Sequence, residues 1–341
     1  MRFGLFQTVQ WPEGSQQHQL YLDAIEQVVL AEELGFDLAW LTEHHFTRHA
    51  ITSDSIALLA YIAAKTQRIR LGTAVAVLPF HDPVRLAEST ALLDHLSEGR
   101  LDVGIGRGYQ YKEYHGFGIP LEEGTARFEE ALELLLRSWA AEEPFAFQGT
   151  FNRYDAAWPQ PKPYQQPHPP LWHATTGEDG LRRCAENDWG IILAQGTTLA
   201  SVGQVLDRYR EQLERVGRPY SPENVMIARG MYCGATDEEA LANYVGPYRA
   251  FLDLAAEVSA APSGGGESAP RNPFQVADEA SLRESIITGS PDTCEVSLRA
   301  LEEMGIGNVI FFVNLGGLAH ASVVESLRRF GSEVLPRFRA P

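Results

Sequence analysis

The sequence has few cysteines, no long apolar run and a shortage of basic residues. Its three cysteines, Cys184, Cys233 and Cys294, show no paired or metal-like spacing, which indicates reduced thiols in a cytoplasmic protein. No segment approaches the roughly 18 consecutive apolar residues of a membrane span, and the N-terminus lacks the pattern of a signal peptide. The formal net charge of −17 argues against a nucleic-acid partner, because binding to phosphate backbones requires basic surfaces.

A dinucleotide-binding fingerprint is also missing. The first turn between a predicted strand and a helix is long, and it lacks the Gly-x-Gly-x-x-Gly pattern of open doubly wound sheets. The chain does have ordinary globular composition, 44% hydrophobic and 21% charged over 341 residues. Length alone would suggest two domains, but α/β barrels of this size commonly form one. We therefore expect a single domain over residues 1–341.

Strand-like apolar runs alternate with helical patterns at a period of roughly 30 residues. Gly35 and Gly99 end two of the helices, and Ser53 and Asp82 are candidate helix caps. The predicted strands cover residues 2–9, 37–41, 69–78, 101–105, 171–174, 190–193, 224–233 and 308–314. Parallel strands joined by helical crossovers explain this alternation. Eight such strands predict an α/β protein with a (β/α)8 TIM barrel, and an open doubly wound sheet is the alternative.

Two segments interrupt the alternation. Residues 143–170 are rich in proline and lack a helical pattern, so we expect an extended or hairpin excursion that packs on the barrel. Residues 259–276 include a low-complexity stretch of Ala, Pro, Ser and Gly, which packs poorly. This second segment is either a mobile lid loop or a surface insertion.

Titratable side chains mark the end of the second predicted strand. In barrels of this kind the active site lies at the carboxyl ends of the strands. Glu43, His44 and His45 stand at such an end, where a buried strand has no need of them. Adjacent side chains on an extended chain diverge, so one histidine faces the barrel centre and the other faces the wall. A metal site is a weaker alternative, because no second ligand cluster accompanies the histidines.

Two further strand ends indicate an anion site. Gly106-Arg107-Gly108 and then Tyr109 follow the fourth strand, where glycines let a ligand approach the backbone and arginine forks onto an anion. Thr175-Thr176-Gly177 follows the fifth strand and leads into a helix, whose first N–H groups attract phosphate. A glycine turn and a simple helix cap are the structural alternatives.

A series of segments along the chain carries a family signal. They are Leu34-Gly-Phe-Asp37, Trp40-Leu-Thr-Glu-His-His-Phe46, Leu71-Gly-Thr-Ala-Val-Ala-Val-Leu-Pro79, His81-Asp-Pro-Val-Arg-Leu-Ala-Glu88, Ser97-Glu-Gly-Arg100, Gly104-Ile-Gly-Arg-Gly108 and Gly305-Ile-Gly-Asn-Val309. In these segments the chain resembles the bacterial luciferase-like family of flavin-dependent monooxygenases. The resemblance runs from end to end and is weaker in the C-terminal half. It implies a barrel with insertion segments and a homodimer.

The resemblance also implies roles for the residues at the cofactor phosphate and the reacting centre. His44 resembles the histidine that assists flavin–oxygen chemistry as a base or hydrogen-bond donor. Glu43 supports it, either by orienting His44 or by fixing the loop. Arg107 resembles the arginine that binds the FMN phosphate. Thr175, Thr176 and Gly177 resemble the segment that cradles the same phosphate.

Other positions correspond to the surroundings of the flavin ring. Ala74-Val75 falls where the family has a non-prolyl cis peptide beneath the isoalloxazine. Gln195 falls where luciferase itself has a tryptophan beside the ring. Gly106 falls where luciferase has a reactive cysteine, so we expect the glycine either to leave room beside the flavin for a bulkier substrate or to reflect a different reaction. Tyr109 is a further cofactor-binding candidate.

The function implied is that of a non-luminescent monooxygenase. Reduced FMN, supplied by a partner flavin reductase, would react with O2 to oxidise a small organic substrate. Two alternatives remain open. One is hydride transfer with the deazaflavin F420, and the other is a non-catalytic flavin-binding relative.

Overall fold

The computed structural model describes residues 1–194, 196–260 and 279–339. In this part of the chain the strands are β1 (Arg2–Gln7), β2 (Leu38–Leu41), β3 (Arg70–Thr73), β4 (Ala76–Val77), β5 (Leu101–Gly106), β6 (Phe145–Gln148), β7 (Arg153–Ala157), β8 (Leu171–Ala174), β9 (Gly190–Leu193), β10 (Val225–Cys233), β11 (Ile286–Gly289) and β12 (Asn308–Phe312). The α-helices are α1 (Gln17–Glu33), α2 (Ser55–Ala63), α3 (Pro83–Leu96), α4 (Tyr111–Gly116), α5 (Gly124–Ala140), α6 (Glu178–Asn187), α7 (Leu199–Arg215), α8 (Asp237–Ser259), α9 (Glu279–Glu284), α10 (Pro291–Glu303) and α11 (His320–Arg329).

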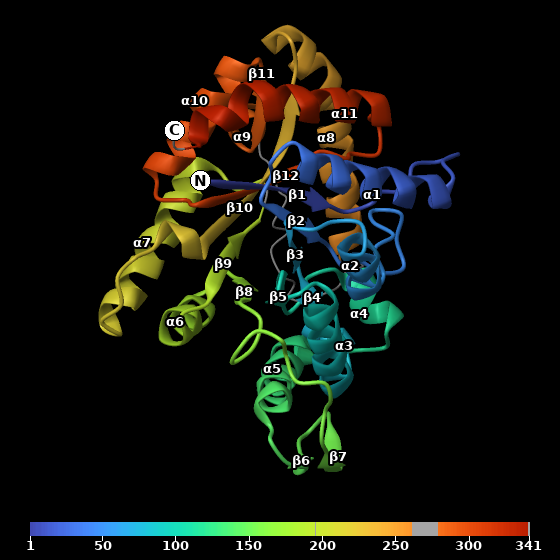
Figure 1. Ribbon diagram of the computed structural model, residues 1–341, viewed down its shortest axis with the longest axis vertical. Coiled ribbons are helices and arrows are strands. Elements are labelled where there is room, and N and C mark those ends of the chain that lie inside the picture. Colours follow the sequence, from blue (N-terminus) through green and yellow to red (C-terminus); the bar gives the residue numbers. More distant parts are fainter. Residues whose placement is uncertain (195, 261–278, 340–341) are drawn as a thin grey trace.

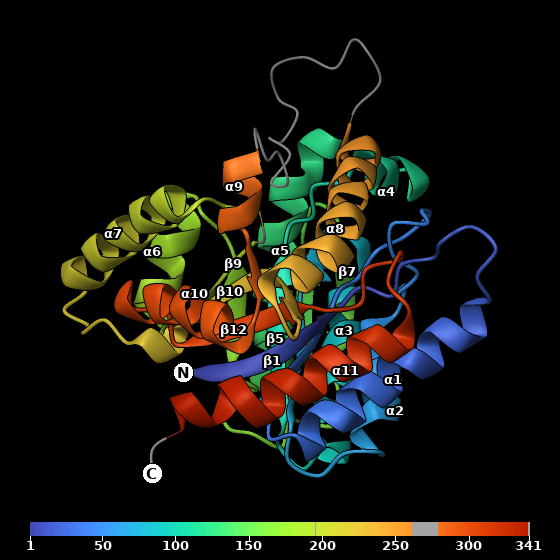
Figure 2. The same cartoon turned by 90° about the horizontal axis from the view of Figure 1, so that it is seen from above.

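Eight parallel strands close into a barrel. They follow one another in the order β12, β1, β2, β3, β5, β8, β9 and β10, and β10 pairs with β12 to complete the ring. Helices surround the strands (Figure 1), with α1 and α11 side by side on one flank (Figure 2). The predicted TIM barrel is confirmed, and the open doubly wound sheet is wrong.

Two strands differ from the prediction. The third predicted strand, residues 69–78, is split into β3 and β4 at Ala74–Val75, and the chain then turns in a short helical segment, Leu78–Phe80. β3 pairs with the start of β5, and β4 pairs with its end. The short strand β11 was not predicted. It extends the sheet by pairing with Gly230–Cys233 of β10.

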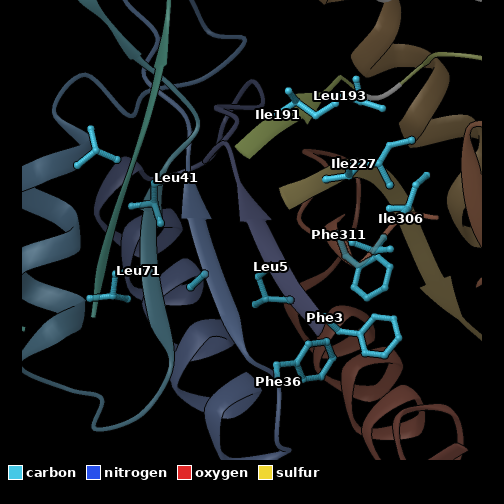
Figure 3. Packing of buried hydrophobic residues seen from close by; sticks show 14 of the residues in the cluster. Phe3, Leu5, Phe36, Leu41, Leu71, Ile191, Leu193, Ile227, Ile306 and Phe311 are labelled. Carbon is cyan, nitrogen blue, oxygen red and sulfur yellow. The ribbon is translucent and has the colours of Figure 1, made fainter. Parts of the chain in front are cut away.

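Alternate residues of each strand face two different layers, as the two-residue period of a strand requires. Phe3 and Phe311 belong to the outer layer, where they pack with Phe36 and with helix residues. Figure 3 shows these three rings gathered between the strands and the helices. Trp40 and Trp172 belong to the inner layer, and their rings meet edge to face with centroids 5.7 Å apart.

The inner layer closes the barrel beneath the strand ends. Gly72 makes room for the indole of Trp40, because a Cβ at Gly72 would lie 2.3 Å from that ring. The two tryptophans pack in the lumen with other side chains of the inner layer, such as Leu38 and Met226. Open space is left toward the carboxyl ends of the strands, where the cavity described below is found.

The proline-rich segment 143–170 contains an antiparallel hairpin, β6–β7, which projects away from the barrel (Figure 1). Phe145 packs on Leu134 of α5, and the guanidinium of Arg137 lies 4.3 Å from the centroid of the Phe145 ring. Trp158 and Tyr164, after the hairpin, are more than half exposed. Of the expected lid, 259–276, residues 261–276 lie outside the described residues, and Ser259 is the last residue of α8.

Helix caps agree with the sequence in one case and differ in another. Asp82 caps α3 by accepting the N–H groups of Val84 and Arg85, as predicted. The predicted cap Ser53 is wrong, because the adjacent Asp54 accepts the N–H of Ala57 at 2.9 Å and starts α2. None of the helices in the described ranges combines the length and apolar character needed to span a lipid bilayer.

Candidate active site

A cavity of about 460 Å³ lies at the carboxyl ends of the barrel strands. All eight strands, or the loops that follow them, contribute to its wall. The predicted site residues that line it are Glu43, His44, Ala74, Val75, Gly106, Arg107, Tyr109, Thr175 and Thr176. Gly177 is the residue that immediately precedes α6. Gln195 lies outside the described residues.

The ring of His44 is held by a buried carboxylate. Glu113, in the first turn of α4, places Oε1 2.9 Å from Nδ1 of His44 and accepts the backbone N–H of His45 at 2.9 Å. A carboxylate at that distance requires a proton on Nδ1, so the neutral ring carries its lone pair on Nε2. Nε2 of Gln110 lies 3.1 Å from the same Nδ1; because an NH2 group cannot bond a protonated nitrogen, we assign the opposite amide orientation, in which the Gln110 oxygen faces His44. Glu113 therefore sets the orientation and tautomer of His44.

Glu43 fixes the loop and has no hydrogen bond to His44. One carboxylate oxygen lies 3.1 Å from Nε2 of His45, and the other lies 2.7 Å from Nε2 of His81 and accepts the N–H of Val77. Burial raises the pKa of Glu43, but the hydrogen bonds and charges of the two histidines outweigh burial and bring this pKa below its ordinary value. Burial lowers the pKa of His81, and Glu43 more than reverses that effect, so the pKa of His81 is raised.

The cavity wall at Gly106 is tighter than the sequence suggested. The peptide bond Ala74–Val75 is cis, as the family resemblance implies. A Cβ added to Gly106 would lie 2.6 Å from Cγ2 of Val75. The expectation that Gly106 leaves room beside a flavin is therefore wrong, because the side chain of Val75 already fills that space.

Arg107 gives one side of the cavity a cationic group. Its Nη1 donates to Oγ1 of Thr125 at 3.1 Å. Within the described ranges no carboxylate forms an ion pair with Arg107. The guanidinium is exposed at the cavity wall and retains donors for an anionic ligand.

The start of α6 lies beside the same part of the cavity. No side chain caps this helix, and a Cβ at Gly177 would meet no atom within 4 Å, so the space beside the helix start is open. The N–H of Gly177 donates to Oγ1 of Thr175 at 3.3 Å. Thr175 and Thr176 line the cavity. Hydroxyl groups, the uncapped N–H groups of the helix start and an arginine together suit a phosphate.

The acidic residues in the first turn of α6 are directed to other partners. Asp179 pairs with Arg182 at 3.0 Å, and Glu178 lies 3.6 Å from Arg215. Their charges are thus partly neutralised by cations on α6 and α7, which reduces their repulsion of an anion at the helix start.

His49 and Thr8 also belong to the residues around the cavity, and no sequence pattern indicated them. His49 is buried, and its ring stacks on Phe251 of α8 with centroids 4.9 Å apart. Burial, to which the nearby His44 adds, holds the pKa of His49 well below its ordinary value. The imidazole is therefore neutral at pH 7.

Glu113 and His49 could not be identified from local sequence patterns. Glu113 is 69 residues from His44 along the chain, and His49 lies in the irregular segment between β2 and α2. Their only signal is that both follow strand ends. As far as the described residues go, no group of three or more His, Cys, Asp or Glu side chains is arranged to hold a metal ion.

Comparison with known protein families gives a match over most of the chain. The model described as luciferase-like monooxygenase matches residues 1–308. The oxygenase component of a flavin-dependent trigonelline monooxygenase from Acinetobacter baylyi is 28% identical over 99% of this chain and 96% of its own length. An uncharacterised Sinorhizobium fredii protein, y4vJ, is 31% identical over 65% of this chain, and the match spans only 62% of that relative.

Solved structures share the fold over the full length. The monooxygenase RslO1 from Streptomyces bottropensis has a TM-score of 0.89 and 26% identity, with 99% of this chain and 100% of that chain covered. The oxygenating constituent of 3,6-diketocamphane monooxygenase from Pseudomonas putida, in complex with FMN, has a TM-score of 0.80 at 20% identity over 100% and 99%. A coenzyme F420-dependent tetrahydromethanopterin reductase from Methanopyrus kandleri has 0.74 at 18% over 99% of each chain, and these last two likenesses concern the fold alone.

Proposed function

The chain belongs to the luciferase-like monooxygenase family, a family of flavin-dependent enzymes, and on that premise we propose that it uses reduced FMN and O2 to oxidise a small organic substrate. In this proposal it emits no light and receives its reduced flavin from a separate reductase. The proposal rests on one observation. A single cavity contains hydrogen-bond donors that suit an anion, at Arg107 and the start of α6, together with an imidazole of fixed tautomer, His44.

Different residues of the cavity would bind the phosphate and the ring system of FMN. Arg107 would fork onto the phosphate, with Thr175, Thr176 and the N–H groups after Gly177 completing its surroundings. Ala74, Val75, Gly106 and Tyr109 would contact the ring system. Bound reduced FMN supplies the electrons that activate O2.

His44 acts on protons beside the reacting atoms. Its Nε2 has a lone pair and no partner in the described ranges, so it can accept a proton or a hydrogen bond in the cavity. The carboxylate of Glu113 stabilises the positive charge that the ring acquires when it accepts a proton. Glu43 acts indirectly, as a positioning residue that holds the loop carrying His44. The apolar side chains of Val75 and Phe312 keep water from the site.

The proposed partners follow from the relatives. The Acinetobacter relative is by name an oxygenase component, which supports a separate flavin reductase here. We propose that the enzyme is a cytoplasmic homodimer, on the basis of the family resemblance and of the unpaired cysteines, which are all buried.

Anaerobic titration tests the cofactor. We expect photoreduced FMN to bind the protein in the micromolar range or tighter, and admitted O2 to be consumed with oxidation of an added substrate. F420 is titrated in parallel. Its tail carries a phosphodiester and several carboxylates, whereas Arg107 is the only arginine or lysine among the described residues that line the cavity. Tight binding of F420 without binding of reduced FMN would overturn the FMN proposal and favour hydride transfer instead.

The His44→Ala variant tests for catalysis. We expect it to bind reduced FMN but to lose most substrate oxidation, by roughly 10²-fold or more, as general acid–base groups contribute. Unchanged turnover in this variant would remove His44 from the mechanism. Absence of turnover in the unmodified protein with every substrate class tried, despite flavin binding, would favour a non-catalytic relative.

A further inference from the structure

Arg229 of β10 carries a buried positive charge that no carboxylate neutralises. Its side chain is 1% exposed, and within the described ranges no Asp or Glu forms an ion pair with it. Burial lowers the pKa of Arg229 to about 10, an effect that the nearby Tyr248 and Glu284 offset only in part, so the guanidinium stays protonated at pH 7. Charges are rarely buried without a counter-ion, because a buried charge loses its hydration. The charge of Arg229 therefore needs an explanation in its surroundings.

The hydrogen bonds of Arg229 hold the turn that follows β9. Nη2 donates to the backbone carbonyl of Thr197 at 2.8 Å, and Nη1 donates to the carbonyl of Ala228 at 3.1 Å. The hydroxyl of Thr197 donates in turn to the carbonyl of Ala194 at 2.7 Å. Nε of Arg229 has no partner in the part of the chain that the structure describes. An uncharged amide could also donate to these carbonyls, so the hydrogen bonds alone do not explain the charge.

The guanidinium lies directly behind the wall of the cavity. Ala228 lines the cavity, and so does Ala194, which the guanidinium reaches through Thr197. Arg229 itself is not among the lining residues, because neighbouring residues of a strand point to opposite faces and Arg229 shares the outer face of β10 with Met231. Its charge is thus separated from the cavity by the backbone of the wall. Away from bulk water, a charge at such a distance still acts on a charge inside the cavity.

The other charged groups at the cavity lie elsewhere on its wall. Arg107 follows β5, which is separated from β10 by β8 and β9 on the shorter way round the barrel. The carboxylates of Glu43 and Glu113 belong to the loop after β2 and to α4, and both are bonded to histidines. Arg229 therefore makes the part of the wall at β9 and β10 electropositive, independently of the group proposed to bind the phosphate.

Reduction changes the charge of a flavin ring. The oxidised ring is neutral at pH 7, whereas the reduced ring readily loses the proton on N1 and becomes an anion. Both forms of FMN carry the same phosphate, so a group that contacts only the phosphate cannot distinguish them. A fixed positive charge at the cavity favours the form whose ring is negative.

We propose that Arg229 gives the cavity a preference for reduced over oxidised FMN, by stabilising the negative charge of the reduced ring through the wall at Ala194 and Ala228. This inference rests on the proposed function, because it concerns the cofactor of that same cavity. An oxygenase that receives reduced flavin from a separate reductase needs such a preference, since oxidised flavin would otherwise occupy the cavity. Arg229 touches neither the cofactor nor the substrate in this proposal and acts through its charge.

Paired titrations with the two redox states of FMN test the proposal. The dissociation constants of oxidised FMN and of photoreduced FMN under anaerobic conditions are measured for each protein. Arg229→Gln removes the charge and keeps an NH2 donor, and Arg229→Met removes both. Arg100→Gln is the matched control, because Arg100 also donates to backbone carbonyls, those of Ile69 and Ala63, but precedes β5 at the opposite end of the barrel. The absorption spectrum of reduced FMN bound to the unmodified protein shows whether its ring is the anion or the neutral form.

We expect the unmodified protein to bind reduced FMN more tightly than oxidised FMN and to hold it as the anion. Arg229→Gln and Arg229→Met should each reduce this preference about tenfold, by weakening the binding of reduced FMN. The two-electron midpoint potential of bound FMN should fall correspondingly, by about 30 mV for a tenfold change. Arg100→Gln should keep the preference of the unmodified protein.

A preference that persists in both uncharged variants would overturn the inference and leave FMN as the cofactor. Equal weakening of oxidised and reduced FMN would also overturn it, because it would show that Arg229 only maintains the shape of the wall. Reduced FMN bound as the neutral form to the unmodified protein would overturn it without any variant, and this measurement decides the question if the variants do not fold. Failure of the unmodified protein to bind FMN in either redox state would refute the proposed cofactor together with the inference.

Discussion

Oε1 of Glu113 lies 2.9 Å from Nδ1 of His44, although the two residues are 69 positions apart in the chain. This contact joins α4 to the end of β2 and fixes the tautomer of the His44 imidazole. A histidine that acts through such a partner should lose function when the partner is removed, even though the imidazole itself remains.

The first prediction concerns this pair. Glu113→Gln keeps an oxygen for the N–H of His45 but removes the charge beside His44, so we expect turnover to fall by roughly tenfold or more with little change in reduced-FMN affinity. Rates are measured in single-turnover experiments. In a His44→Ala background the same substitution should have almost no further effect, because the two residues act as a unit. Effects that multiply in the double variant would show that Glu113 acts independently of His44.

The second prediction concerns stability and pH. His81 has a folded pKa raised above its ordinary 6.5, so its contribution is complete below pH 6.5 and is lost as pH rises through the raised value. Glu43 has a depressed pKa, so its contribution is present above its ordinary 4.5 and is lost as pH falls through the lowered value. The pair should stabilise the fold most between these two values.

Urea unfolding of the unmodified protein and of Glu43→Gln from pH 5 to pH 9 checks this. We expect the substitution to cost about 3 kcal/mol near pH 6, as when one partner of a buried pair is removed, and to cost less at the alkaline end. Glu325→Gln is the control, because Glu325 pairs with Arg329 at the exposed surface of α11 and such pairs contribute little. A difference between unmodified and Glu43→Gln protein that stays constant with pH would contradict the assignment to His81.

The third prediction concerns the phosphate. Arg107→Ala should weaken the binding of reduced FMN by about 1.5–3 kcal/mol, the range for a hydrogen bond between charged groups. The same variant should bind reduced riboflavin, which lacks the phosphate, as well as the unmodified protein does. Arg208→Ala, a surface variant on α7, serves as the control. Equal losses for FMN and riboflavin would mean that Arg107 does not contact the phosphate.

The fourth prediction concerns the tight contact at Gly106. A methyl group at this position would meet Cγ2 of Val75 at 2.6 Å, so Gly106→Ala should destabilise the protein by roughly 1–3 kcal/mol, as overpacking does. Val75→Ala removes the obstructing atoms, and the double variant should recover most of the loss. The measurement is a double-mutant cycle of unfolding free energies. Additive costs in the double variant would show that the two side chains do not compete for the same space.

Much of the architecture could be predicted because it depends on short stretches of chain. The barrel is predicted by the periodicity of strands and helices, by the Asp82 cap and by the repeated alternation. Each of these patterns depends on residues within a few positions of one another. Because barrel sites lie at strand ends, the sequence also predicts that His44, Arg107 and Thr175 line one cavity. The exceptions are local as well. The strand β11 was missed, and the chain changes direction at Ala74–Val75 within a run that reads as one strand.

The sequence by itself determined the barrel, the family and the side chains that stand at the strand ends. Only the tertiary structure decided which of them meet. Glu113 rather than Glu43 supports His44, Val75 fills the space that Gly106 seemed to offer, and His49 stacks on Phe251 beside His44. Such pairings arise when barrel closure brings together loops from distant units, and nothing in the residues adjacent to His44 or Gly106 encodes the partner that closure supplies.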